Sequence, residues 1–220
     1  MKKNGVREFE NGRWTGTDQV LVFRHTEALS MVTKGQKALD IGCGDGLLLA
    51  ALAKAGVMAS GIDVSEEGAK KCKEKGFDVS VADISTEDLP FHDKTFDTVI
   101  MLDILEHLYD PEALLREAVR VSKQNIIISV PNFNSLPARL QVLIGRVPEN
   151  NLPNKGHLYW FNHRILMKLL KRNGLQIEKI SCNTFWEYNF FIGKIMKKVC
   201  LYFPNVFALS FVAKVNIKAK

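Results

Sequence analysis

Five short apolar runs recur between residues 37 and 130, each bounded by glycine, aspartate or proline. Their length and their content of valine and isoleucine are typical of strands that are buried on both faces of a sheet. These runs predict strands over residues 37–41, 58–64, 78–84, 96–102 and 125–130.

Amphipathic segments with helix start and stop signals lie between these runs, at residues 47–56, 65–76 and 110–122. Ser65 and Asp110 are suited to N-cap positions and Pro111 to the first helical position. Strands that alternate with helices in this way form βαβ units. The pattern therefore predicts an α/β fold: a Rossmann-like, doubly wound, mostly parallel seven-stranded sheet with helices on both faces.

The pattern changes after residue 131. It predicts helices over 133–144, 162–173 and 184–203, and two further strands over 175–182 and 205–218. We expect this last pair to be antiparallel at one edge of the sheet, with the C-terminal strand at the edge itself. The chain is then a single domain, 1–220, made of an N-terminal helical cap (1–35), a core (36–131) and a second half with inserted helices (132–220).

The stretch LDIGCGDG follows the first predicted strand and places Gly42, Gly44 and Gly46 at alternate positions. Glycine permits positive φ and lets a ligand approach the backbone. A dinucleotide fingerprint would need glycine at position 47, which is leucine, and no Gly-Lys-Ser/Thr follows to make a P-loop. Asp40 and Asp45 would repel a pyrophosphate, so a cationic ligand suits this turn better.

Four elements in order, LDIGCGDG, GIDVS, VADI and FDTVIMLDILEHL, resemble the class I S-adenosylmethionine-dependent methyltransferases. The resemblance covers residues 36–131 and extends more weakly to residue 180. The segments SVPNF, RLQVLIGRVP and GHLYWF are similar to a broad group that includes the methionine biosynthesis MetW-like proteins and proteins acting on lipids or quinones. The resemblance implies S-adenosylmethionine as cofactor and methyl transfer to a small-molecule acceptor, which could be amphiphilic.

The resemblance also implies roles for residues at the strand ends. Asp40 would hold the amino group of the cofactor, and the three glycines would shape the floor under its methionyl part. Asp63, with Val64 beside it, would accept the ribose hydroxyls. The adenine would lie against Asp83 and Ile84, and the sulfonium against Leu102 and Asp103.

Methyl transfer needs alignment above all, and it needs a base only when the nucleophile is protonated, as a hydroxyl is. His107 and His157 are the candidate catalytic residues. The alternatives are that the Glu106-His107 pair supports the cofactor pocket and that His157 packs a loop. Asn132, Tyr159 and Trp160 are the candidate substrate contacts.

Charge distribution and cysteine content limit the binding partners and the cellular compartment that we expect for this protein. Residues 1–132 carry a balance of −5 and residues 133–220 one of +11. The segment 184–203 combines apolar spacing with Lys194, Lys197 and Lys198, so it either lies on an anionic membrane surface or covers the substrate pocket. We expect no nucleic acid partner, because no RNA-binding motif accompanies the lysines. Four scattered cysteines indicate a reduced, cytoplasmic protein and predict no metal site.

One alternative to an enzyme stays open. The chain could be a non-catalytic protein that binds S-adenosylmethionine and regulates a partner. The set Asp40, Asp63 and Asp83 argues for cofactor binding in either case, whereas the absence of an evident base in the sequence leaves both interpretations possible.

Overall fold

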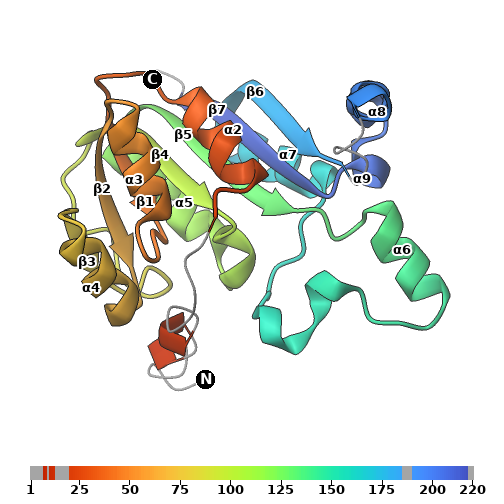
Figure 1. Cartoon of the computed structure of the whole chain (residues 1–220), viewed down its shortest axis with the longest axis horizontal. Helices are drawn as coiled ribbons and strands as arrows, with labels where there is room; N and C mark the ends of the chain where they lie inside the picture. Colours follow the sequence, from red (N-terminus) through yellow and green to blue (C-terminus); the bar gives the residue numbers. More distant parts are fainter. Residues whose placement is uncertain (1–6, 9, 13–19, 185–189, 218–220) are drawn as a thin grey trace.

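Seven strands form one sheet in the order β3-β2-β1-β4-β5-β7-β6 (Figure 1). The computed structural model describes residues 7–8, 10–12, 20–184 and 190–217. The order reverses between β1 and β4, so the carboxyl ends of these two strands flank the switch point where ligands bind in doubly wound sheets. The five strands predicted for the first half are present and parallel: β1 (Lys37–Ile41), β2 (Met58–Asp63), β3 (Val79–Val81), β4 (Phe96–Leu102) and β5 (Ser122–Pro131).

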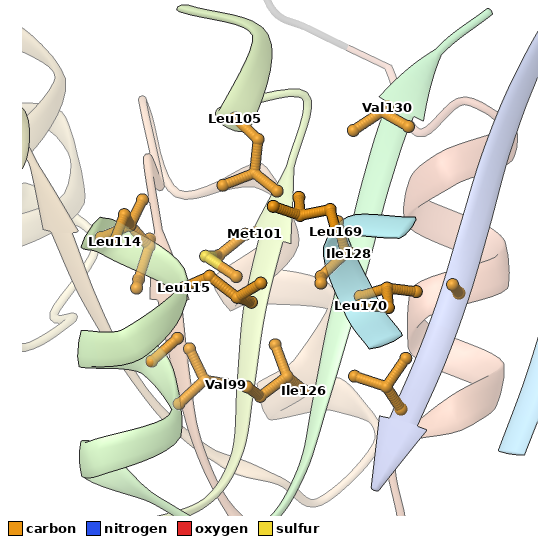
Figure 2. Packing of buried hydrophobic residues seen from close by; sticks show 14 of the residues in the cluster. Val99, Met101, Leu105, Leu114, Leu115, Ile126, Ile128, Val130, Leu169 and Leu170 are labelled. Carbon is orange, nitrogen blue, oxygen red and sulfur yellow. The ribbon is translucent and has the colours of Figure 1, made fainter. Parts of the chain in front are cut away.

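The central strands send alternate side chains into two apolar layers. In β5, Ile127 faces the layer of α2 (Phe23–Met31) and α3 (Leu47–Lys54), whereas Ile126 and Ile128 face the layer of α5 (Pro111–Val121) and α7 (His163–Arg172). All three isoleucines are fully buried. Figure 2 shows the second layer, where leucines of α5 and α7 pack on β4 and β5 through Leu114, Leu115, Leu169, Leu170, Val99, Met101, Ile126 and Ile128.

The helices begin at the predicted caps. The Ser65 hydroxyl accepts a hydrogen bond from Gly68 N at 3.1 Å at the start of α4 (Glu66–Glu74), and the Asp110 carboxylate accepts from Glu112 N and Ala113 N at the start of α5. Helix α7 begins at a cap that the sequence pattern did not single out. The Asn162 side chain accepts a hydrogen bond from Ile165 N at 3.0 Å.

The last two strands correct one detail of the predicted topology. β6 (Leu175–Asn183) and β7 (Ser210–Ile217) are antiparallel to each other at one edge of the sheet, as expected. The C-terminal strand β7 is not the edge strand, however, because it pairs with β5 as well as with β6. The edge is β6, and β7 is the one strand that runs against both of its neighbours.

Short helices and loops follow β5 and β6 at the right of Figure 1. They comprise the 3₁₀ turns η2 (Glu149–Asn151) and η3 (Pro153–Lys155) and the helices α6 (Leu136–Leu143), α8 (Phe190–Tyr202) and α9 (Pro204–Phe207), whereas the 3₁₀ turn η1 (Leu105–His107) directly follows β4. The helix expected over 184–203 is thus present from Phe190, and residues 185–189 lie outside the described part of the chain. Among the described helices, none has the length and apolar character needed to cross a bilayer.

Candidate functional site

The glycine turn joins β1 to α3 with three left-handed residues. Gly42, Gly44 and Gly46 have φ angles of 78°, 54° and 83°. A Cβ added at Gly42 would overlap Cδ1 of Ile104, and one at Gly46 would lie 2.9 Å from Sγ of Cys72. At both positions the left-handed backbone favours glycine, and a larger side chain would also have to displace Ile104 or Cys72.

Gly42→Ala is expected to destabilise the protein by about 2–4 kcal/mol, since it combines a positive φ with an overlap against Ile104. Ile104→Ala should remove the overlap but not the backbone strain. Gly42→Ala should thus cost about 1–2 kcal/mol less in the Ile104→Ala background, and urea unfolding of the four proteins measures this coupling. Equal costs in both backgrounds would contradict the packing.

Asp63, at the carboxyl end of β2, ties the glycine turn to the start of α4. Its Oδ2 accepts a hydrogen bond from Gly44 N at 2.8 Å, and its Oδ1 accepts one from Ser65 N at 2.7 Å. Burial raises the pKa of this carboxyl, whereas the backbone donors of Ser65, Gly44 and Val64 oppose that rise. A carboxylate oxygen has a second lone pair, so Asp63 could still accept ribose hydroxyls beyond these backbone contacts.

Asp40 is a buried acid on β1 beside the glycine turn, with 3% of its surface exposed. Burial, and then the neighbouring Asp63, raise the pKa of Asp40 to about 7. A desolvated acid of this kind gains most from a cationic ligand, which restores the charged form. Asp40 stays the candidate for the amino group of the predicted cofactor.

The candidate adenine contacts follow β3. The Asp83 Oδ1 accepts hydrogen bonds from Ser85 N at 3.0 Å and Ser85 Oγ at 2.6 Å, which begins a turn. β3 therefore ends at Val81, earlier than the predicted end at residue 84. Ile84 is half-buried against the apolar layer that contains β4. Both residues lie beyond the carboxyl end of β3, on the same side of the sheet as Asp63.

The end of β4 carries a backbone outlier. Asp103 has φ 54°, which is uncommon for a residue other than glycine and is often found at functional sites. Its N–H donates to the carbonyl and hydroxyl oxygens of Ser129, and its carboxylate accepts from Ser129 Oγ. Leu102, the half-buried residue before it, ends β4 next to this turn.

The start of α2 reaches the same edge of the sheet. Nε of Arg24 lies 3.4 Å from the carboxylate of Asp103. Burial, and then the Arg24 charge, lower the pKa of His25 to about 4, against the opposing charges of Asp103 and Asp45. Neutral His25 accepts a hydrogen bond from Val22 N through Nδ1 at 3.1 Å. Helix α2 belongs to the N-terminal helical cap predicted over residues 1–35, of which residues 1–6, 9 and 13–19 lie outside the described part of the chain.

Three side chains form a cluster just beyond the end of β4. Glu106 and His107 come from η1, and His157 comes from the loop after η3. One ligand atom of each lies within 4.8 Å of the others, and the two imidazole centroids are 4.8 Å apart. The carbonyl oxygen of Glu106 accepts hydrogen bonds from Leu158 N and Tyr159 N at 2.7 and 2.9 Å, which holds the two segments together.

Aromatic rings border this cluster. The Phe133 ring lies 5.4 Å from the His157 ring and stacks on Trp160 at 6.2 Å. Trp160 is 59% exposed, so this pair borders solvent. Phe133, which the sequence reading did not select, directly follows the carboxyl end of β5 and its neighbour Asn132.

The other two candidate substrate contacts have partners within the chain. Asn132 is fully buried. Its Nδ2 donates to the carbonyl oxygen of Ala208 at 2.7 Å, and its Oδ1 accepts from Asn134 N at 3.0 Å. Tyr159 is half-buried and packs on Phe161. Both stay predictions as substrate contacts, although the geometry of Asn132 favours a role in holding α9 against β5.

Comparisons with known proteins show what the chain is similar to. The family model described as methionine biosynthesis protein MetW matches residues 23–172. A ubiquinone biosynthesis O-methyltransferase of Methylococcus capsulatus is 38% identical over 117 residues, which cover 50% of this chain and 49% of that protein. The protein of the same description from Thiobacillus denitrificans is 31% identical over 160 residues, which cover 69% of each. The match therefore spans about half of the first relative's length and two thirds of the second's.

A solved structure shows the same fold over the whole chain. Magnesium protoporphyrin IX methyltransferase from Synechocystis PCC 6803, determined with bound SAH, superposes with a TM-score of 0.67 at 20% identity. The superposition covers 99% of this chain and 100% of the other.

Proposed function

Because the chain belongs to the MetW family, and with it to the class I S-adenosylmethionine-dependent methyltransferases, we propose that it methylates a hydroxyl on an aromatic, quinone-like acceptor. S-adenosylmethionine is the cofactor. Two relatives named ubiquinone biosynthesis O-methyltransferase support this acceptor class. The observation that carries the proposal is the grouping of Glu106, His107 and His157 beside an aromatic pair at the carboxyl edge of the sheet.

The cofactor would be held by the residues at the strand ends. In the proposed arrangement Asp40 binds the amino group, Asp63 the ribose, and Asp83 with Ile84 the adenine. When bound, S-adenosylmethionine supplies the methyl group: a carbon–oxygen bond to the acceptor forms, the carbon–sulfur bond breaks with its electron pair going to sulfur, and the hydroxyl loses its proton. In this arrangement Leu102 and Asp103, at the end of β4, would line the sulfonium, and η1 follows them directly in the chain.

The Glu106–His107–His157 cluster would promote loss of the hydroxyl proton. A phenolic hydroxyl has a pKa near 10, so it is protonated and a poor nucleophile at neutral pH. The cluster lies within a few residues of the proposed sulfonium site in sequence, since Leu102 is followed by Glu106 and His107. The Phe133–Trp160 pair would hold the acceptor ring by offset stacking.

Exposed apolar side chains on α6, on the loop after it and on α8 support an amphiphilic acceptor. Residues Leu140, Val142, Leu143, Ile144 and Val147, on α6 and the loop after it, are all more than half exposed. In α8, Ile195 and Leu201 are exposed as well. A long apolar tail on the acceptor would cover part of this surface. Contact of α8 with a membrane stays a prediction.

A turnover assay over three acceptors tests the proposal, with S-adenosylhomocysteine as the measured product. The acceptors are a vicinal aromatic diol with an alkyl tail, the same diol without the tail, and an aliphatic alcohol with the tail. We expect turnover with both diols, a lower KM for the tailed one, and none with the alcohol. Cofactor binding by calorimetry without turnover on either diol would favour the non-catalytic alternative.

Trp160→Ala is expected to raise KM for an aromatic acceptor about 3- to 10-fold with little change in kcat, because one aromatic contact contributes roughly 0.5–1.5 kcal/mol. Met58→Ala is the matched control. Met58 is a similarly exposed apolar residue, and it begins β2 at the opposite edge of the sheet. An unchanged KM in Trp160→Ala would remove this residue from the acceptor site.

A further inference from the structure

We infer that Glu106, His107 and His157 form a binding site for one divalent transition-metal ion of the Zn²⁺ class. Two imidazoles and one carboxylate with open positions are a ligand set that proteins use for Zn²⁺ and Fe²⁺, whereas Mg²⁺ and Ca²⁺ prefer oxygen ligands. The sequence alone predicted no metal site, because His157 is separated by about fifty residues from the Glu106-His107 pair and no ligand spacing is visible along the chain.

The histidine tautomers favour metal binding. His107 Nδ1 lies 3.2 Å from the carbonyl oxygen of Gly156, and His157 Nδ1 lies 2.7 Å from that of Asn150. A carbonyl oxygen only accepts hydrogen bonds, so each Nδ1 carries a proton. In a neutral imidazole this leaves a lone pair on Nε2, and backbone contacts of this kind orient most metal-bound histidines.

The distances leave room for an ion between the three donors. His157 Nε2 is 3.9 Å from Glu106 Oε1, which is longer than a hydrogen bond. Donors around a tetrahedral Zn²⁺ are separated by about 3.4 Å, given metal–ligand distances near 2.1 Å. A closure of about half an ångström therefore brings this pair to bonding distance.

Burial gives the carboxylate a reason to bind a cation. The Glu106 side chain is 1% exposed and that of His157 12% exposed. A cation is attracted more strongly by a carboxylate that is removed from water than by one at the surface, because the local dielectric constant is lower. The buried Glu106 carboxylate is therefore suited to hold a divalent ion together with the two imidazoles.

The ion would have a task in catalysis, and this part rests on the proposed function. A hydroxyl bound at an open position of the ion has a lowered pKa, so it ionises near neutral pH and releases its proton to solvent. His107 and His157 would then act as ligands rather than as bases. The aromatic pair beside them would place the acceptor ring so that its hydroxyl reaches the ion.

Metal binding is tested on the full chain without an affinity tag, after treatment with a chelator and dialysis. The probes are Zn²⁺, measured by equilibrium dialysis and elemental analysis, and Co²⁺, measured by its visible absorption. We expect one ion per chain, and binding weakened about 100-fold or more in His157→Ala and in Glu106→Gln. His92→Ala is the control, since His92 is an exposed histidine in the loop before β4. This variant should bind the ion as tightly as the wild type does.

The outcomes separate the two proposals. Absence of stoichiometric binding, or binding that His157→Ala leaves unchanged, overturns the metal site. Because Glu106 is buried, its substitution could unfold the protein, so the Glu106→Gln result is used only if the variant retains its affinity for S-adenosylmethionine. If it does not, His157→Ala alone tests the metal site. Turnover that survives complete metal removal also overturns the catalytic role of the ion but leaves the proposed function intact. Stoichiometric binding without turnover on any acceptor supports the site and rejects the function.

Discussion

Asp40→Asn is expected to stabilise the ligand-free protein above pH 7 while it weakens S-adenosylmethionine binding. The reason is the burial that raises the pKa of Asp40 to about 7 from an ordinary value of 3.8. Above pH 7 the native protein must hold a buried negative charge, which the unfolded chain carries in water at little cost. Asparagine has the same shape and never ionises.

The direction follows from proton linkage. Between pH 4 and pH 7 the native state keeps a proton on Asp40 that the unfolded state has lost, so this group lowers the free energy of unfolding as pH rises. The effect is complete above the native pKa. Three pH units correspond to about 4 kcal/mol. In a protein of this size, about 4 kcal/mol corresponds to roughly 8–16 °C in Tm.

Thermal unfolding of wild type and Asp40→Asn at pH 4 and pH 8 measures this effect. The difference between the two proteins should be larger at pH 8 by up to about 4 kcal/mol. Titrating groups far from residue 40 are present in both proteins and cancel in the comparison, whereas the coupling between Asp40 and Asp63 is part of the measured difference. A difference that is independent of pH would mean that Asp40 is already ionised at pH 4.

Cofactor affinity should change with pH in the opposite direction to the stability of the ligand-free protein. If Asp40 binds the ammonium group, the wild type must ionise this carboxyl on binding, so affinity rises up to about tenfold per pH unit below pH 7 and levels off above it. Asp40→Asn should bind weakly and lose that part of the pH dependence. Calorimetric titration from pH 5.5 to pH 8.5 provides the comparison, and equal pH profiles would exclude Asp40 from the amino-group site.

Asp63→Ala is the second substitution with a large expected effect, because it removes contacts within the chain and the proposed contact to the cofactor at once. Within the chain it leaves the N–H groups of Gly44 and Ser65 without their acceptor, at a cost of about 2–4 kcal/mol in stability. Toward the cofactor it removes the proposed ribose contact, which should weaken affinity by about 1–3 kcal/mol, or roughly 5- to 150-fold.

Asp63→Asn separates the two effects. Asparagine keeps one acceptor oxygen, so it should recover part of the stability. It replaces the other oxygen with a donor that faces either a backbone N–H or a ribose hydroxyl. Asp78→Ala is the control, since Asp78 is an exposed acid just before β3. Unchanged affinity in Asp63→Ala, measured by calorimetry where the protein is folded, would reject the ribose assignment.

The sequence predicted the site as far as it depends on strand ends. The acids at or near the carboxyl ends of β1, β2, β3 and β4 are separated by about twenty residues each, and parallel strands bring such positions to one edge whatever the details of packing. Asp40, Asp63, Asp83 and Asp103 could therefore be grouped from order alone. Their roles toward the cofactor remain predictions that the substitutions above address.

Contacts between distant loops could not be predicted in this way. His157 reaches Glu106 because Leu158 N and Tyr159 N donate to the Glu106 carbonyl oxygen, and no periodicity encodes such a contact. Arg24 reaches Asp103 only because α2 packs across the sheet. Asn132 shows the converse case: its position after β5 predicted a substrate contact, whereas its carboxamide binds Ala208 and Asn134.

By itself the sequence determined the parallel half of the sheet, the glycine turn and the acids at the strand ends, because apolar periodicity and glycine conformation act over a few residues. Only the tertiary structure decided that β7 lies between β5 and β6, that Ile104 fills the space over Gly42, and that Asp40 is buried deeply enough for its pKa to approach 7. These features depend on which distant side chains exclude water from a given atom. Burial of that kind is a property of the packed molecule and not of any local stretch of the chain.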